Sequence, residues 1–129
     1  MELKKQSALE NIDACKELLE SMSDALWDHP ETGYHEHFAA RLYCRMLEKL
    51  GFQGLAGIET AFSGTYGSGK PVIGFLGEFD ALPGLSQQAN VTRMCPVTEG
   101  GPGHGCGHNL LGVGALAAAL GVKKYLEDN

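Results

Sequence analysis

The sequence lacks long apolar runs and an excess of basic residues. No apolar stretch in its 129 residues approaches the roughly 20 residues that a membrane-spanning helix needs. Ten Lys and Arg stand against 16 Asp and Glu, giving a net charge of −6. Binding to phosphate groups needs a positive field. We therefore expect neither nucleic acid nor a membrane as a partner.

Paired cysteines are also missing. The four cysteines stand at positions 15, 44, 95 and 106, and no two form a Cys-x-x-Cys pair. The first residues, Met-Glu-Leu-Lys-Lys-Gln, lack the apolar region of a secretory signal. Together these features predict a cytoplasmic chain whose thiols are free or bind a metal, rather than a disulfide framework.

Glycine is scarce in the first part of the chain. Only Gly33, one of 18 glycines, precedes residue 51, so we expect helices first and strands and loops later. Apolar residues at helical spacing predict helices over about residues 3–27 and 35–50, with Gly51 as the cap that ends the second. An Ala- and Leu-rich helix is expected over about residues 109–126, and the length indicates one domain or part of one.

The middle of the chain is predicted to form strands and loops. Residues 52–66 predict short strands, in a hairpin or an edge pair. Residues 72–76, Val-Ile-Gly-Phe-Leu, are apolar on both faces, which is typical of a strand inside a sheet that is covered on both sides. A long irregular stretch follows over residues 84–107. The order of elements predicts an α/β fold, a layered sheet with flanking helices, onto which Gly112 and Gly114 would let the last helix pack closely.

Two carboxylates follow the expected buried strand. In open α/β sheets, ligands bind beyond the carboxyl ends of the strands. Alternation along a strand would point Glu78 and Asp80 to the same face. A strand-end pair that meets solvent or caps a neighbouring helix is an equally good interpretation of these two residues.

A second candidate site lies in Gly103-His-Gly-Cys-Gly-His108. His104, Cys106 and His108 alternate with glycine, so an extended backbone would place all three side chains on one face. Imidazole and thiolate are ligands that zinc prefers. Three alternatives remain open: a glycine loop that cradles phosphate, ordinary buried Cys and His, and a nucleophilic Cys106 with a histidine base.

The motifs together resemble a known family. Asp-Ala-Leu-Pro at 80–83, then His-Gly-Cys-Gly-His-Asn at 104–109 opening an Ala/Gly-rich helix, resemble the di-zinc aminoacylase and carboxypeptidase superfamily of metallopeptidases. The similarity is greatest to its amidohydrolase branch, which holds p-aminobenzoyl-glutamate hydrolase and related dipeptidases. Leu-Trp-Asp-His-Pro-Glu-Thr-Gly-Tyr at 26–34 also resembles that branch's N-terminal signature.

The resemblance implies a metal-activated water that attacks an amide carbonyl of a small N-acyl amino acid or dipeptide. Carried over by position, Cys106 and His108 are metal ligands, and Asp80 is the catalytic-site carboxylate that orients a ligand. Glu78 stands where the wider superfamily has a histidine ligand, and His104 matches a branch histidine with a supporting role. The implied cofactor is a divalent metal, zinc first and manganese as the alternative.

Further parts of that family have no counterpart in this sequence: a Glu-Glu pair, two later histidines and a dimerisation domain. We therefore expect residues 1–129 to be the N-terminal portion of a metallohydrolase catalytic domain. Alone, this portion should bind metal weakly and hydrolyse negligibly. One rival hypothesis is a non-catalytic interaction fragment that self-associates through an exposed sheet edge or apolar face. The other is a thiol enzyme that uses Cys106.

Overall fold

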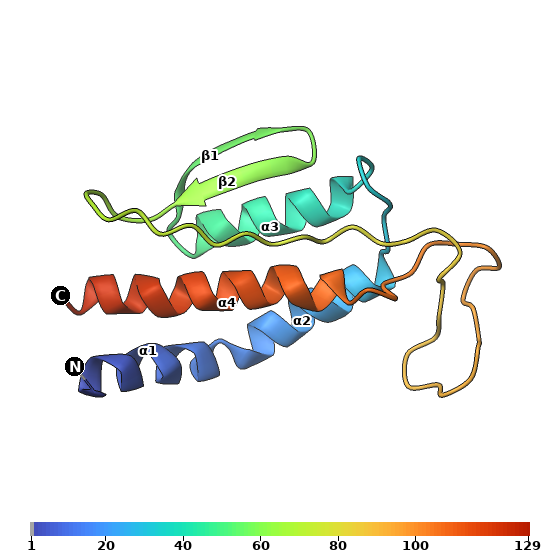
Figure 1. Cartoon of the computed structure of the whole chain (residues 1–129), viewed down its shortest axis with the longest axis horizontal. Helices are drawn as coiled ribbons and strands as arrows, with labels where there is room; N and C mark the ends of the chain where they lie inside the picture. Colours follow the sequence, from blue (N-terminus) through green and yellow to red (C-terminus); the bar gives the residue numbers. More distant parts are fainter. Residues whose placement is uncertain (1) are drawn as a thin grey trace.

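The computed structural model describes the backbone of residues 2–129 and the side chains of residues 4–53 and 57–129. In chain order the elements are α1 (Glu2–Ala14), α2 (Lys16–Asp28), α3 (His37–Lys49), β1 (Gln53–Ile58), β2 (Ala61–Thr65) and α4 (His108–Glu127). Figure 1 shows α1 and α2 end to end along α4, with α3 on the other side of α4 and the β-hairpin outside α3. The described residues thus form a mixed fold of helices and a two-stranded antiparallel sheet.

The first helical stretch bends at Cys15. We expected one helix over residues 3–27, but the backbone of Cys15 (φ −89°, ψ 2°) leaves the α-helical region and separates α1 from α2. The Cys15 N–H still donates to the carbonyls of Asn11 at 3.2 Å and Ile12 at 3.0 Å. The shorter-range bond tightens one turn, as in a 3₁₀ helix, and redirects the axis. The expectation of a single helix over residues 3–27 was therefore wrong.

The end of α3 confirms Gly51 as its cap. Gly51 has φ 84°, in the left-handed region where glycine pays no Cβ penalty. Its N–H donates to the Glu48 carbonyl at 3.0 Å, and the Phe52 N–H donates to the Leu47 carbonyl at 2.9 Å. Leu47 and Phe52 are both buried. These two bonds and this apolar contact together form a Schellman motif, which turns the chain sharply into β1.

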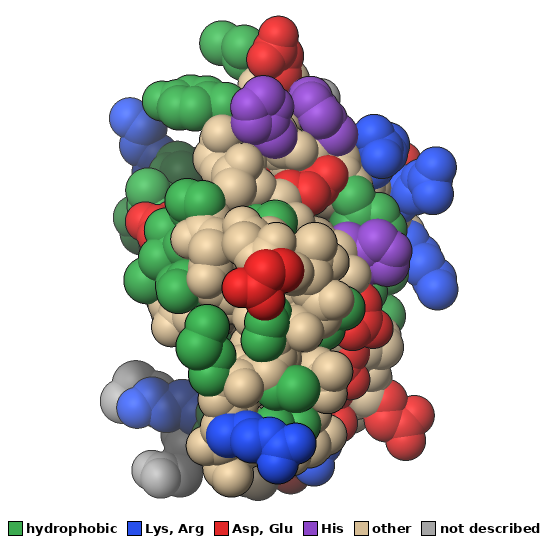
Figure 2. All heavy atoms as spheres, turned by 90° about the vertical axis from the view of Figure 1, so that its right-hand side faces the viewer, with side chains coloured by type: hydrophobic (Ala, Val, Ile, Leu, Met, Phe, Trp, Pro, Cys, Tyr) green, Lys and Arg blue, Asp and Glu red, His purple; other side chains and the backbone are tan. Residues whose placement is uncertain are grey.

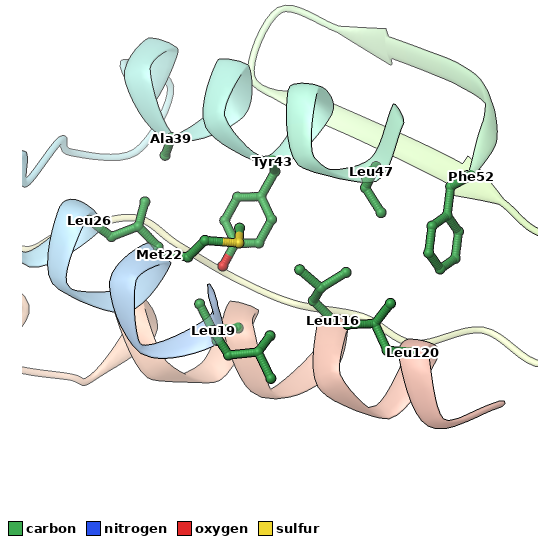
Figure 3. Packing of buried hydrophobic residues seen from close by; sticks show 10 residues of the cluster. Leu19, Met22, Leu26, Ala39, Tyr43, Leu47, Phe52, Leu116 and Leu120 are labelled. Atoms are coloured by element: carbon green, nitrogen blue, oxygen red, sulfur yellow. The ribbon is translucent and has the colours of Figure 1, made fainter. Parts of the chain in front are cut away.

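The core lies between α2, α3 and α4 (Figure 3). Met22 and Leu26 of α2 are the largest side chains that are almost completely buried, at 1% and 0% exposure. They face α3 and α4, and burial of a side chain of this size contributes about 1.5–3 kcal/mol. The other buried apolar members of the cluster are Leu19, Ala39, Tyr43, Leu47, Phe52, Val113, Leu116 and Leu120. This packing fixes the start of α4 against α2 and α3, which matters for the site described below.

The expected buried strand over residues 72–76 is not present, and this prediction was wrong. Val72 is 83% and Leu76 92% exposed. Among the described residues, β1 and β2 are the only paired strands, so no neighbouring strand lies beside residues 72–76. The segment instead runs as an extended trace along α4 (Figure 1). A strand that is apolar on both faces is buried only when other elements cover it, and here one side alone meets a helix.

Gly112 lets the chain just after that segment pack closely on α4. A Cβ added at Gly112 would lie 2.5 Å from the Tyr43 hydroxyl oxygen and 2.8 Å from the Glu78 carbonyl oxygen. Gly112 therefore has the packing role that the sequence predicts. A Cβ at Gly114 would meet nothing within 4 Å, so the same expectation for Gly114 was wrong.

Residues 84–107 contain no helix or strand but are held by their own polar contacts. The Gln87 side-chain amide donates to the Arg93 carbonyl at 2.9 Å and its oxygen accepts from the Cys95 N–H at 2.9 Å. The Ser86 hydroxyl accepts the N–H groups of Val97 at 3.1 Å and Thr98 at 3.0 Å.

Among the described helices, none has the length and apolarity to cross a bilayer.

Candidate metal centre

Main-chain bridges bring the two sequence motifs together. The Leu82 N–H donates to the Gly103 carbonyl at 3.0 Å, and the Gly103 N–H donates back to the Leu82 carbonyl at 2.9 Å. This reciprocal pair ties the chain just after Asp80 to the chain just before His104. His108, the first residue of α4, then lies beside the carboxylates that follow residues 72–77.

His108 contacts two carboxylates, one through each ring nitrogen. Its Nδ1 lies 2.8 Å from Asp80 Oδ1, and its Nε2 lies 3.3 Å from Glu78 Oε2. One donor atom from each of these residues falls within a group less than 4.8 Å across. The side chain of His108 is 21% exposed, that of Asp80 31% and that of Glu78 64%. Glu78 and Asp80 therefore reach the same partner, as their alternation in the sequence predicts.

These distances suit a divalent cation. A metal-binding histidine typically donates its second ring N–H to a carboxylate, and the Nδ1–Asp80 bond leaves the Nε2 lone pair free. Two ligand atoms that each lie about 2.0–2.1 Å from a tetrahedral zinc ion are roughly 3.3–3.4 Å apart. The observed 3.3 Å between Nε2 and Glu78 Oε2 matches that spacing.

Cys106 lies outside the donor group of Glu78, Asp80 and His108. Its side chain is exposed. With His108 it lines a surface groove of about 760 Å³, whose other walls include Phe75, Leu76 and Leu111. Figure 2 views the molecule from the end at which residues 84–107 turn back, and histidine and acidic side chains are exposed together on that face. The role of Cys106 as a ligand stays a prediction.

The three alternating side chains do not share one face, contrary to the expectation from an extended backbone. The chain turns between them, because the Gly107 N–H donates to the His104 carbonyl at 3.0 Å and Gly107 has φ 72°. Cys106 therefore faces solvent, while His108 begins α4. Glycine makes both an extended run and this left-handed turn accessible, so the letters alone could not distinguish them.

His104 holds the loop against α2. It is only 5% exposed, and its Nε2 lies 3.1 Å from the Leu26 carbonyl oxygen. Burial lowers the pKa of His104, although the bond to the Leu26 carbonyl partly opposes this effect. The ring is thus turned toward the end of α2, which favours a structural role over metal ligation.

Glu31 is a supporting residue that our reading of the sequence missed. Its two carboxylate oxygens accept the N–H groups of Phe38 at 2.8 Å and Ala39 at 3.0 Å, in the first turn of α3. Its carbonyl accepts the Ala81 N–H at 2.7 Å. One residue thus caps α3 and fixes the chain next to Asp80. The sequence carries no local signal for this cap, because Glu31 lies six residues before His37, whereas Glu36 directly precedes α3 and makes no side-chain cap bond.

Asn109 fixes the other side of the site. It is 6% exposed, and its Nδ2 donates to the Ser23 hydroxyl of α2 at 3.1 Å. The bond holds the first turn of α4 against α2. Because Asn109 follows His108 directly, it also limits where the imidazole can lie.

Comparison with known proteins finds relatives that are hydrolases by name. One of the subunits of p-aminobenzoyl-glutamate hydrolase from Escherichia coli (strain K12) is 49% identical over 120 residues, covering 91% of this chain and 25% of the relative. The Xaa-Arg dipeptidase of Mus musculus is 34% identical over 141 residues, covering 99% and 29%. That of Homo sapiens is 34% identical over 143 residues, covering 98% and 29%. No protein-family model matches the chain.

These relatives support the resemblance of residues 80–83 and 104–109 to the amidohydrolase and peptidase superfamily. The chain spans about a quarter of the length of the relatives that it matches. The relatives are hydrolases by name, and the family implies a divalent metal. The group of Glu78, Asp80 and His108 offers such an ion a set of donors.

Proposed function

We propose that residues 1–129 form the N-terminal portion of the catalytic domain of a metal-dependent amidohydrolase. The reaction is hydrolysis of the amide bond of an N-acyl amino acid, such as p-aminobenzoyl-glutamate, or of a dipeptide. The names of the relatives support this substrate class. The observation that carries the proposal is the position of His108 between the carboxylates of Asp80 and Glu78. The four free thiols are consistent with the reducing cytoplasm as its location.

The proposed metal is zinc, with manganese as the alternative. His108 would bind it through Nε2, with the Glu78 carboxylate and the Cys106 thiolate as further ligands. A thiolate ligand favours zinc over manganese. When bound, the ion would polarise the amide carbonyl and lower the pKa of a bound water to about 7.

The chain's own residues would position this chemistry. Asp80 accepts the Nδ1 proton of His108 and so keeps the ring oriented with Nε2 toward Glu78. Asn109 and Glu31 hold the two segments that carry these side chains. The groove beside Cys106 is lined mainly by apolar residues and is large enough for a small organic molecule. It would take the apolar acyl or side-chain part of the substrate.

We propose that the 129-residue chain alone binds metal weakly and hydrolyses negligibly. A catalytic zinc site normally has three protein ligands and an open position. Among the described residues, only one group of three metal-type side chains lies this close together, and Asp80 in it is engaged by Nδ1. Assays of zinc binding by calorimetry and of p-aminobenzoyl-glutamate cleavage test this, and appreciable turnover by the chain alone would refute it.

A chimera tests the function itself. The matching region of the Escherichia coli hydrolase is replaced by this chain, and p-aminobenzoyl-glutamate hydrolysis is measured with and without a chelator. We expect a chelator-sensitive activity that is lost in His108→Ala and kept in His35→Ala, an exposed histidine outside the donor group. A folded chimera that hydrolyses equally well with His108→Ala would contradict the proposal.

The thiol mechanism gives a different result in the same assay. If Cys106 were the nucleophile, alkylation by iodoacetamide would abolish hydrolysis, and chelation would leave it unchanged. The metal mechanism predicts loss on chelation, restored by added zinc.

A further inference from the structure

Three aromatic rings from three different segments pack together beside the candidate metal centre. The centroid of the Phe79 ring lies 5.3 Å from that of Tyr43 in α3 and 5.6 Å from that of Phe62 in β2, and the latter two are 6.0 Å apart. Aromatic pairs with centroids about 4.5–7 Å apart attract each other beyond the effect of apolar burial. Tyr43 is 5% exposed, and Figure 3 shows its side chain pointing from α3 toward α4. The cluster of these three rings therefore joins the segment around Phe79 to the core.

Phe79 stands between the two carboxylates of the donor group in the sequence. In an extended chain, successive side chains point to opposite sides. The Phe79 ring packs against the buried core, so Glu78 and Asp80 are directed away from the core. Their carboxylates accordingly reach His108, with Glu78 Oε2 at 3.3 Å from Nε2 and Asp80 Oδ1 at 2.8 Å from Nδ1. The inward ring and the outward carboxylates thus depend on the same stretch of backbone.

We infer that Phe79 is a positioning residue for the donor group of Glu78, Asp80 and His108. Its ring, held by the other two rings of the cluster, fixes the rotation of the chain about its own axis. That rotation decides where both carboxylates lie relative to the imidazole. The inference rests on the proposed function, because it concerns the same donor group. Phe79 has no ligand atom of its own, so it acts through its two neighbours.

Main-chain contacts alone leave this rotation undetermined. On one side the chain approaches α4 at Gly112, where an added Cβ would lie 2.8 Å from the Glu78 carbonyl oxygen. On the other side the Ala81 N–H donates to the Glu31 carbonyl at 2.7 Å. Two contacts along a chain fix its path but not the rotation about that path. The ring of Phe79, which extends away from the backbone into the cluster, supplies the third contact.

A flat ring suits this purpose better than an aliphatic side chain. The plane of the Phe79 ring lies within 18° of the plane of Phe62 and at 30° to that of Tyr43, so the cluster restrains the orientation of the ring as well as its place. A leucine would keep part of the apolar contact but would present no plane to stack. Phe79→Leu should therefore loosen the two carboxylates, whereas Phe79→Tyr, which keeps the ring, should hold them.

The tautomer of His108 in the metal-free chain tests the inference without zinc. Because Asp80 accepts the Nδ1 proton, imidazole ¹⁵N spectra of the wild type, recorded where the ring is neutral, should show the proton on Nδ1. In Phe79→Leu the spectrum should shift toward the Nε2–H form, which free histidine favours, and Phe79→Tyr should keep the wild-type spectrum. Phe52→Leu is the matched control. It makes the same change at another ring of the core, in contact with Tyr66, and should leave His108 unchanged.

Zinc affinity gives a second measurement. Competition calorimetry should show about tenfold weaker binding in Phe79→Leu, the lower end of the loss when an orienting partner is removed. Phe79→Tyr and Phe52→Leu should bind as the wild type does. A purely structural role would lower the urea midpoints of Phe79→Leu and Phe52→Leu alike and would leave the tautomer unchanged. If Phe79→Leu does not fold, Phe62→Leu, which removes one ring of the cluster, should shift the tautomer in the same direction to a smaller extent.

The outcomes separate this inference from the proposed function. A folded Phe79→Leu whose His108 keeps the wild-type tautomer would overturn the positioning role. An unchanged tautomer in Phe62→Leu would do the same if Phe79→Leu were unfolded. A wild-type chain that binds no zinc would overturn the metal site instead, and the tautomer would still decide the role of Phe79.

Discussion

Replacing Asp80 by Asn should weaken zinc binding without unfolding the chain. The Asp80 carboxylate accepts the Nδ1–H of His108 at 2.8 Å. The substitution removes the charge that strengthens this bond. It also lets the amide turn and donate its own N–H to Nδ1, which would place the ring proton on Nε2, where the metal binds. Both effects act on the metal through His108 and leave the packing of α4 in place.

The expected loss can be bounded. Removing a carboxylate that orients a metal-bound histidine typically costs 10–100-fold in metal affinity. The Asp80 side chain is 31% exposed, and water therefore screens part of its charge. We expect the lower end, about tenfold, which is about 1.4 kcal/mol.

Competition calorimetry with a chelator of known affinity measures this difference. Asp28→Asn, a change of equal charge at an exposed site on α2, is the matched control and should bind zinc as the wild type does. Glu78→Gln, which alters a proposed ligand, should lose at least as much affinity as Asp80→Asn. If Asp80→Asn bound zinc as tightly as the control, Asp80 would not orient the ligand.

Three further predictions concern stability in chelator, read as midpoints of urea unfolding. Glu31→Ala should lower the free energy of unfolding by about 1–2 kcal/mol, because two N–H groups of α3 lose their acceptor; no change would mean that water replaces the cap. Gly112→Ala should lower it by about 1–3 kcal/mol through overpacking against Tyr43, whereas Gly114→Ala, in open space, should raise it by up to about 1 kcal/mol through helix propensity. Equal effects at the two glycines would contradict the close approach. Burial lowers the pKa of His104 from 6.5, so the imidazole binds a proton more readily in the unfolded chain than in the folded chain. The contribution of the neutral His104 ring to stability is therefore complete above pH 6.5 and falls as the pH drops below that value. His104→Gln should lose this part of the pH dependence, and an unchanged profile would contradict the buried neutral ring.

Local patterns predicted most of the helices and the hairpin. The helical spacing of apolar residues located α3 and α4 to within two residues, and Gly51 ends α3 as expected. These features depend on residues that are close in the sequence, so the spacing of apolar residues and glycine is enough to predict them. The bend at Cys15 was missed because the apolar stripe continues through it and no proline or glycine marks it.

The segment 72–76 shows where sequence reasoning fails. Its composition is that of a strand covered on both sides, but composition cannot say which elements provide the cover. The burial of such a strand depends on long-range contacts, and the described chain supplies one helix on one side. The exposure of residues 72–76 therefore depends on the tertiary arrangement rather than on the sequence of the segment itself.

The candidate site was partly predictable. Alternation correctly placed Glu78 and Asp80 toward a common partner, whereas the role that the resemblance gives Asp80, orienting a metal ligand, stays a prediction. The prediction of a common face for His104, Cys106 and His108 was wrong because the chain turns at Gly107. The supports from Glu31 and Asn109 depend on tertiary contacts with no sequence period.

Zinc K-edge X-ray absorption on a small amount of zinc bound to an excess of the concentrated chain tests the central claim most directly. The account predicts a first shell of nitrogen and oxygen at about 2.0–2.1 Å with one sulfur at about 2.3 Å. The sulfur should disappear in Cys106→Ser, and the imidazole scattering should disappear in His108→Ala. A shell of water oxygens alone, or a spectrum that His108→Ala leaves unchanged, would contradict a metal centre at this site.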